Sequence, residues 1–570
     1  MCKITGLRVP NGPTTHYVPL ERSQHPLVKV DPNAIKSYNP EQLPLRTHSE
    51  MLQQGQEVEN APSTAAANRL AKQYGVKGVP LLSHLDSLSF PGSFPYDFMH
   101  LIWENLIKNL VLLWTGEFKG LDEGSGEYVL GKAVWEAVAS LGASAGDTIP
   151  SAYGSRIPNL SKDRPNVSAE MWGFWTQYLG PVLLHRRFRK ERYYRHFLEL
   201  VRLLNICLKF ENTRAEIDEV RLGFVDWVQK YEKFYYQYKP DCLPTCPLTI
   251  HALLHIADSI KFCGPVWAYW AFPMERFCGT LTPAIRSRRH PWASLDRHIL
   301  EVAQLTQVKM VYNVVRDLDL DYDSDDESDS TQDGFSDPAC CVLSFPLISK
   351  LIIVQDPSCI LLPPRAPLRP TETQVRAIAG AIVTRTGCTI TQANIALRHA
   401  LIEEYGRVKR IDSEAGDTMR SSNLGIRPED SRDNTYISYY AIIDLNARNK
   451  KAPFKYAKEV FYGQLNHIYR ITFPTALPTL NISAATTMIF AAIRTCNVEP
   501  VKNKIDKTLS CLNIRMYSGH RELDIIDMKN IVGLVGRIPL TSNRWAIIDR
   551  NAVLELAEWE GDINADQSNR

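Results

Sequence analysis

The chain has 570 residues, of which 44% are hydrophobic and 22% are charged. This balance is ordinary for globular proteins and excludes wholesale disorder and a fibrous fold. The 65 basic and 63 acidic residues leave a net charge of only +2, so any nucleic-acid binding has to come from local basic patches. The length is too great for one hydrophobic core and predicts about three to four domains.

Cysteine usage and hydropathy indicate where the protein works. The twelve cysteines are dispersed, and the chain does not open with a basic segment followed by an apolar one, so we expect reduced thiols and no secretion. The longest apolar run, residues 106–114, is interrupted by Lys108 and Asn109 and is too short to span a bilayer. A nuclear or otherwise cytosolic protein without a membrane partner is expected.

The first eighty residues lack the apolar periodicity of a helix or a strand. Residues 1–80 are rich in Pro, Asn, Gln, Ser and Thr and are predicted to form an irregular lead-in. Helical spacing dominates over residues 81–316, which are predicted to form a helical domain. Two apolar faces carry this prediction: Met99, Trp103, Leu106, Leu110 and Leu113, and then Phe197, Leu200, Val201, Leu204 and Leu208.

An acidic run follows the helical region. Residues 317–337 contain nine aspartates and one glutamate without a basic residue, and like charges at this density resist compaction. A flexible, disordered linker is therefore expected over residues 317–340. Beyond it, residues 341–411 are predicted to form an extended lead-in and a small pair of helices, with Thr371 and Thr389 as N-caps.

β-branched and aromatic residues dominate the C-terminal part. A polar linker is predicted over residues 412–434, and residues 435–560 then contain strand-like segments such as YISYYAIIDL, TMIFAAI and RWAIID. Short strands at this spacing favour a small antiparallel barrel, followed by a tail over residues 561–570. The expected fold class is α+β and multidomain, with mainly helical first two thirds and a small antiparallel β-barrel-like C-terminal domain.

One candidate for chemistry is the segment YDFMHLIWEN, residues 96–105. Asp97, His100 and Glu104 are spaced by three and four residues and so share one face of a helix. A divalent metal could bind such a face, but two-metal phosphoryl transfer needs carboxylates from several different elements. The alternative is a buried helix in which Asp97 is the N-cap and His100 lies in the core.

Four potential zinc ligands, Cys242, Cys246, His251 and His255, lie close together in the sequence. A zinc finger separates its ligand pairs by about twelve residues, and the four residues between Cys246 and His251 leave no room for that hairpin. The segment LTIHALLHIADSI has helical spacing, so the two histidines are interpreted as helix-core or contact residues. The sequence therefore assigns no metal site.

Two basic stretches are candidates for DNA contact. The first, His185–His196, mixes cations with Phe188, Tyr193 and Tyr194, a combination that suits phosphate contact and base stacking. The alternative is an amphipathic helix with a solvated basic face. The candidate DNA-binding residues are Arg186, Arg187, Arg189, Lys190, Arg192 and Arg195 in the first stretch, and Arg286, Arg288 and Arg289 in the second.

The segment GPVWAYWAFPMERFCG, Gly264–Gly279, joins a Gly-Pro turn to an aromatic run and a Pro-x-Glu-Arg step. It resembles the region after the catalytic core of CACTA-type (Enhancer/Suppressor-mutator-like) transposases, as found in fungal mobile elements. The Asp97-x-Met99-His100 block and the segments IPSAYGSRIPN and WGFWTQYLGP extend the resemblance over most of the chain. Five further residues belong to it: His251, His255, Arg286, Arg289 and Pro291.

The resemblance implies a remnant of an RNase H-like core. Asp97 and Glu104 are carried over as candidate catalytic residues, although the family's acidic residue follows the Met-His pair more closely than Glu104 does. The other two acidic residues of the family lie upstream of a Cys/His-containing insertion, in which this chain begins, with Cys2 as half of a Cys-x-x-Cys pair. No other cysteine precedes Cys207, so a closed zinc site in the N-terminal region is not expected.

Aromatic residues in and near the Gly264–Gly279 segment are interpreted as packing groups. Glu275 and Arg276, adjacent and surrounded by aromatics, are predicted to form a buried or half-buried pair that fixes the fold. The tryptophans assigned to core or interdomain packing are Trp172, Trp175, Trp267, Trp270 and Trp292.

The leading functional hypothesis is a transposase-derived, catalytically incomplete relic that retains DNA or protein binding. One alternative is an active Mg²⁺-dependent DNA strand-transfer nuclease that is completed in trans, and another is a non-enzymatic protein or chromatin interaction module. DNA is the expected partner, with a protein partner or a second copy of the chain as alternatives. No small-molecule cofactor is expected, and Mg²⁺ is implied only for the active alternative.

Overall fold

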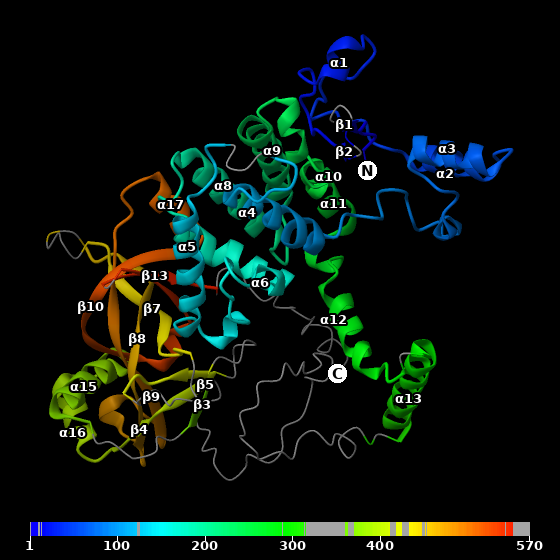
Figure 1. Ribbon diagram of the computed structural model, residues 1–570. Helices are drawn as coiled ribbons and strands as arrows, with labels where there is room; N and C mark the ends of the chain where they lie inside the picture. The colour runs from blue at the N-terminus through cyan, green and yellow to red at the C-terminus, as the bar shows by residue number, and fades with distance from the viewer. Residues whose placement is uncertain are drawn as a thin grey trace. The chain divides into compact units, whose positions relative to one another are not determined.

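A computed structural model describes residues 2–550, except for 9–11, 13, 122–125, 288, 313, 315–358, 363–369, 411–417, 424–431, 447–450, 452 and 542. The chain divides into two units, and Figure 1 labels the helices and strands along the chain. The first contains Met1–Trp270, Arg432–Asn466 and Ala492–Arg570, and the second contains Ala271–Ser431 and His467–Ala491. The expected acidic linker over 317–340 and the tail over 561–570 lie outside the described residues.

The helical part of the first unit follows the apolar faces of the sequence. The π-helical stretch η2 (Met99–Ile107) continues into α4 (Lys108–Thr115), and the predicted face from Met99 to Leu113 is at most 2% exposed. Helices α8 (Glu191–Cys207) and α9 (Arg214–Tyr231) pack against each other. Further helices of this part include α5 (Lys132–Ser144), α6 (Ala169–Phe174), η6 (Trp175–Leu179), α7 (Gly180–Leu183), η7 (Glu232–Tyr236), η8 (Pro240–Thr245), α10 (Leu248–Ala252), η9 (Leu253–His255) and α11 (Ile256–Cys263).

The N-terminal region is more regular than predicted. It contains a two-stranded sheet and three helices: β1 (Leu7–Arg8), β2 (Thr15–His16), α1 (Pro26–Val30), α2 (His48–Glu59) and α3 (Thr64–Tyr74). Thr47 and Ser63 cap α2 and α3 by accepting backbone N–H groups, and Gly75 ends α3 with a φ of 69°. Helix α3 buries none of its residues, so it has no apolar stripe that periodicity could reveal. The prediction of an irregular lead-in is wrong over these helices.

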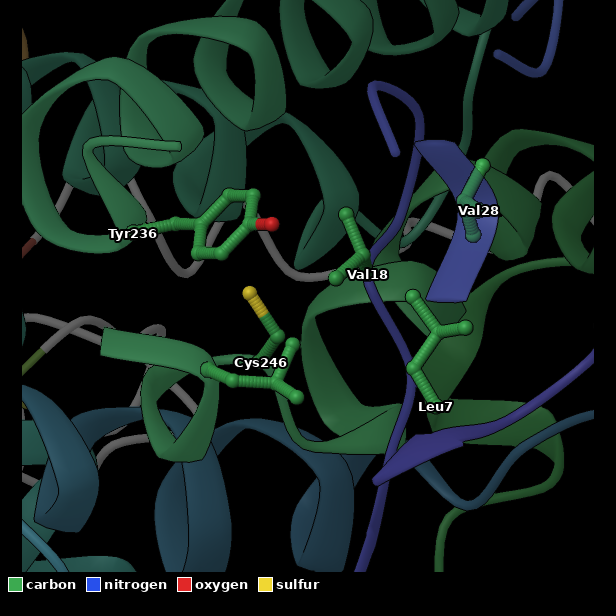
Figure 2. Packing of buried hydrophobic residues seen from close by; sticks show 6 residues of the cluster. Leu7, Val18, Val28, Tyr236 and Cys246 are labelled. Atoms are coloured by element: carbon green, nitrogen blue, oxygen red, sulfur yellow. The ribbon is translucent and has the colours of Figure 1, made fainter. Parts of the chain in front are cut away.

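An apolar cluster joins the N-terminal region to η7 and η8 (Figure 2). The backbone N–H of Tyr17 donates to the carbonyl of Cys246 at 2.8 Å. The carboxylate of Glu232 is 1% exposed and accepts the backbone N–H groups of Leu20 and Glu21 at 2.7 and 3.2 Å. The cluster consists of Leu7, Val18, Val28, Tyr236, Leu243 and Cys246.

The predicted C-terminal barrel is confirmed as a nearly closed antiparallel sheet. Along it the strands follow the order β11-β7-β8-β9-β10-β13-β12, and β4 pairs with β8. The end strands β11 and β12 are joined by Val535 alone, which brings the two edges together. The strands are β4 (Leu401–Tyr405), β7 (Tyr436–Asp444), β8 (Tyr456–Phe473), β9 (Thr486–Val498), β10 (Ile514–Asp527), β11 (Ile531–Leu534), β12 (Gly536–Thr541) and β13 (Arg544–Ile548).

Within the first unit, residues 148–154 form hydrogen bonds that connect the helical part to β12 and β13. The hydroxyl of Thr148 donates to the backbone carbonyl of Arg537 at 2.5 Å, and the hydroxyl of Tyr153 donates to the backbone carbonyl of Ile548 at 2.9 Å. Arg432, which precedes β7, donates to the carbonyl of Gly154 at 2.7 Å. Hydrogen bonds of this kind hold a connection that has little regular structure of its own.

The second unit contains the predicted helical pair. Thr371 and Thr389 form capping boxes with Gln374 and Gln392 at the starts of α15 (Glu372–Thr386) and α16 (Ile390–Leu397), which confirms both N-caps. Further described elements of this unit are α12 (Phe272–Leu281), η11 (Thr282–Ala284), α13 (Pro291–Tyr312), β3 (Cys359–Leu362), β5 (Arg407–Arg410), β6 (Thr418–Arg420) and η14 (Pro478–Leu480). None of the described helices combines the length and apolar character needed to cross a membrane.

Several aromatic and charged residues are more exposed than the sequence suggested. Trp172 and Trp175 are buried as predicted, but Trp267 is 40% and Trp292 is 76% exposed. Glu275 and Arg276 are exposed on α12, which buries none of its residues, so the prediction of a buried pair is wrong.

Candidate nucleic-acid interface

The first basic stretch borders a groove in the first unit. The connection between α7 and α8 and the start of α8 line one side, and the start of α17 (Lys504–Cys511) lines the other, around a volume of about 420 Å³. Four permanent cations and one carboxylate line this groove, which we call the basic groove. These charged residues are Arg186, Arg189, Arg195, Lys504 and Glu191.

Aromatic anchors hold the basic side of the groove in place. Phe188 packs edge-on against Trp114 with ring centroids 5.4 Å apart, and the hydroxyl of Tyr194 donates to the carbonyl of Pro181 at 2.5 Å. Phe188 is 8% exposed, and Tyr193 and Tyr194 are each 1% exposed. These rings belong to the core, so the predicted base stacking by the aromatic residues is wrong.

The predicted DNA-binding cations of the first stretch fall into two classes, those with a side-chain partner and those without one among the described residues. Lys190 and Arg192 both pair with Glu127, with the Arg192–Glu127 contact at 2.7 Å, and Arg195 pairs with Glu191 at 2.8 Å. Arg187 donates to a backbone carbonyl at 3.4 Å. Arg186 and Arg189 are exposed and have neither an ion pair nor a side-chain hydrogen bond to any described residue. These two arginines are therefore the cations of the stretch that a ligand can engage without breaking an existing pair.

The opposite side of the groove was not predicted from the sequence. Asn503 caps α17 by accepting the N–H of Asp506 at 2.9 Å, and Lys504 in the first turn has no side-chain partner among the described residues. The positive end of a helix and an unpaired lysine both favour an anion. Lys504 follows a recognisable helix cap, but its position opposite Arg186 depends on the tertiary fold.

His185 adds no permanent charge to the groove. Burial, together with the nearby Arg186, lowers the pKa of its imidazole below the ordinary value of 6.5. The ring is therefore neutral at pH 7, and the positive charge of the groove comes from its arginines and its lysine.

The second predicted basic stretch lies in the second unit. Arg286 and Arg289 are exposed between η11 and α13. Arg288 falls outside the described residues.

The candidate catalytic residues Asp97 and Glu104 are already engaged with neighbours. Asp97 accepts the backbone N–H of His100 at 2.9 Å, as an N-cap does, and also contacts the His100 ring. His100 has a half-exposed side chain, so its predicted place in the core is wrong. Glu104 pairs with Lys108 one turn further along. Among the described residues, neither carboxylate belongs to a group of three potential metal ligands.

One group of potential metal ligands does exist in the described part of the chain: Cys2, His251 and His255. Burial lowers the pKa of His251 to about 4 and that of His255 to about 3, so both rings are neutral at pH 7, and burial raises the pKa of the Cys2 thiol to about 11. Cys246 lies instead in the apolar cluster of Figure 2. Because Cys2 is far from the histidines in the sequence, local spacing could not reveal this group.

Comparisons with protein-family models, curated proteins and solved structures found no match to this chain.

Proposed function

We propose that this chain is a transposase-derived, catalytically incomplete protein of the nucleus that binds duplex DNA through the basic groove. The observation that carries the proposal is the placement of Arg186, Arg189 and Lys504 around one cavity of about 420 Å³, with none of the three side chains paired to a described residue. The resemblance of the Gly264–Gly279 segment to CACTA-type transposases supports the proposal that the chain derives from a transposase.

Phosphate is the chemical group that fits the groove best. Arginine and lysine that bind phosphate release condensed counterions from DNA, which supplies most of the affinity of sequence-independent binding. A cation without an ion pair contributes its full free energy of phosphate binding. A cation that is already paired must first break its contact with a carboxylate, which offsets part of that free energy. The N-terminus of α17 adds backbone N–H groups that favour an anion at the same place, and the carboxylate of Asp506 in the same turn offsets part of this effect.

The same groove offers little for reading bases. Phe188, Tyr193 and Tyr194 are packed into the core and cannot stack on bases. Contacts to phosphate position a protein on DNA but carry no sequence information. We therefore propose binding to the DNA backbone with little sequence preference from this surface.

Paired and unpaired cations of one stretch allow a matched test. The double variant Arg186→Gln/Arg189→Gln is expected to weaken binding to a random-sequence duplex at least tenfold at low salt, as measured by fluorescence anisotropy. The control Lys190→Gln/Arg192→Gln removes the same charge but only cations already paired with Glu127, and is expected to weaken binding less. Equal losses in both variants, or none in either, would overturn the assignment of the groove.

A second candidate function, protein binding, is favoured by a specific feature of the second unit. An apolar groove of about 170 Å³ lies between α16 and the end of β8, where Ile395 is 53% exposed. Charge reversal at Arg186, Arg187 and Arg189 that leaves DNA affinity unchanged would favour this function. A chain that binds no DNA at any salt concentration would leave protein binding as its proposed role.

A further inference from the structure

The side chains of Cys2, His251 and His255 converge in the first unit. Their potential ligand atoms all lie within 4.8 Å of one another, and the two Nε2 atoms are 3.2 Å apart. His251 is 1% and His255 is 0% exposed. Two ligand nitrogens of a tetrahedral zinc ion with bonds of about 2.0–2.1 Å are separated by about 3.3–3.4 Å, so the rings are already spaced as metal ligands.

We propose that Cys2, His251 and His255 bind one zinc-type transition metal ion. Thiolate and imidazole are the donors that zinc and cobalt(II) prefer over magnesium or calcium. Three protein ligands leave one position of a tetrahedral site for a water molecule. On binding, the metal–sulfur bond replaces the S–H bond of Cys2, and the proton passes to solvent.

Separate elements bring the three ligands together. His251 lies on α10 and His255 at the end of η9, so their spacing of four residues puts both rings on one face. Cys2 forms an isolated β-bridge with Leu45, and the N–H of the next residue, Lys3, donates to the carbonyl of Pro44 at 2.8 Å. The ion would therefore join the N-terminal segment to the α10–η9 helices.

Contacts away from the site hold the same segment in place without a metal. The apolar cluster around Val18 and Tyr236, together with the hydrogen bonds from Leu20 and Glu21 to Glu232, fixes the chain between β2 and α1. Preformed ligands reduce the ordering that a metal has to impose, so the ion is expected to stabilise this region without being required for folding of the whole chain.

Metal content of the full chain tests the proposal directly. We expect one zinc ion per chain by mass spectrometry of metals after purification through a C-terminal tag that is then removed. Cys2→Ser and His255→Gln are expected to lose the ion. Cys242→Ser is the matched control, because Cys242 is a half-buried cysteine that packs against the apolar cluster and lies outside the site, and should retain the ion. Equal zinc content in Cys2→Ser and the parent chain would overturn the proposal.

Cobalt(II) gives a second readout that does not depend on the folding of any variant. The parent chain loaded with cobalt(II) is expected to show the visible bands of a tetrahedral ion and the near-ultraviolet charge-transfer band of a thiolate ligand. Tetrahedral bands without the thiolate band would contradict the role of Cys2. The absence of any cobalt(II) spectrum in a folded, reduced parent chain would contradict the site as a whole.

Discussion

At the scale of single residues, Glu232 is a buried carboxyl group with a strongly shifted pKa. It is 1% exposed, and its oxygens accept the backbone N–H groups of Leu20 and Glu21. Burial raises its pKa from the ordinary 4.5 to about 7, although the two N–H groups oppose this shift. A group whose pKa is higher in the folded state binds its proton more tightly there, so it contributes stability while it is protonated.

This shift predicts a definite sign for the effect of pH on stability. The contribution of Glu232 is full below pH 4.5 and is lost as the pH rises to about 7, with a total of about 3 kcal/mol for a shift of this size. Glu232→Gln cannot ionise, so the stability of the variant relative to the parent should increase from pH 4.5 to pH 8. Urea unfolding of both proteins across this range measures the difference. A difference independent of pH would contradict the raised pKa.

A second prediction at this scale concerns Glu104. Because Glu104 pairs with Lys108 and Asp97 contacts His100, the described residues do not assemble the carboxylates that two-metal DNA cleavage needs. The purified chain with Mg²⁺ or Mn²⁺ is expected to leave supercoiled plasmid intact. Metal-dependent nicking that disappears in Glu104→Ala would contradict this expectation and favour the active transposase.

At the scale of elements, the sequence predicts what periodicity and local capping encode. The apolar faces of η2, α4 and α8 and the strands of the barrel follow directly from side-chain spacing, because each element buries one face. Helix α3 was not predicted because it buries no side chain, although Ser63 and Gly75 mark its ends. Helix α2 buries only Gly55 and Val58, too few for a periodic apolar face, although Thr47 marks its start. Capping residues are therefore the better signal for exposed helices in this chain.

The capping box of α9 allows a test at the element scale. Thr213 accepts the N–H of Glu216, and the Glu216 carboxylate accepts the N–H of Thr213 at 2.8 Å. Thr213→Ala is expected to lower the free energy of unfolding by about 1 kcal/mol, because one N–H at the helix start loses its acceptor. Thr213→Ser keeps the hydroxyl and should recover most of the loss in urea unfolding. Equal destabilisation by both substitutions would show that the cap is not the cause.

At the scale of the whole molecule, sites form from segments that are distant in the sequence. The sequence identified Arg186 and Arg189 by charge alone, but Lys504 joins them only through the packing of the first unit. Cys2 likewise meets His251 and His255 only because the N-terminal segment folds back onto η7 and η8. Periodicity and motif spacing describe neighbours along the chain, so neither grouping was open to prediction from the sequence.

The salt dependence of binding to random-sequence duplex DNA tests the central claim most directly. The parent chain is expected to show a linear decrease of log K with log salt concentration and a slope of about −2.7 or steeper, corresponding to three or more phosphate contacts at about 0.9 each. The triple variant Arg186→Gln/Arg189→Gln/Lys504→Gln should lose most of that slope. An unchanged slope in the triple variant, or no binding by the parent at low salt, would contradict DNA binding through the basic groove.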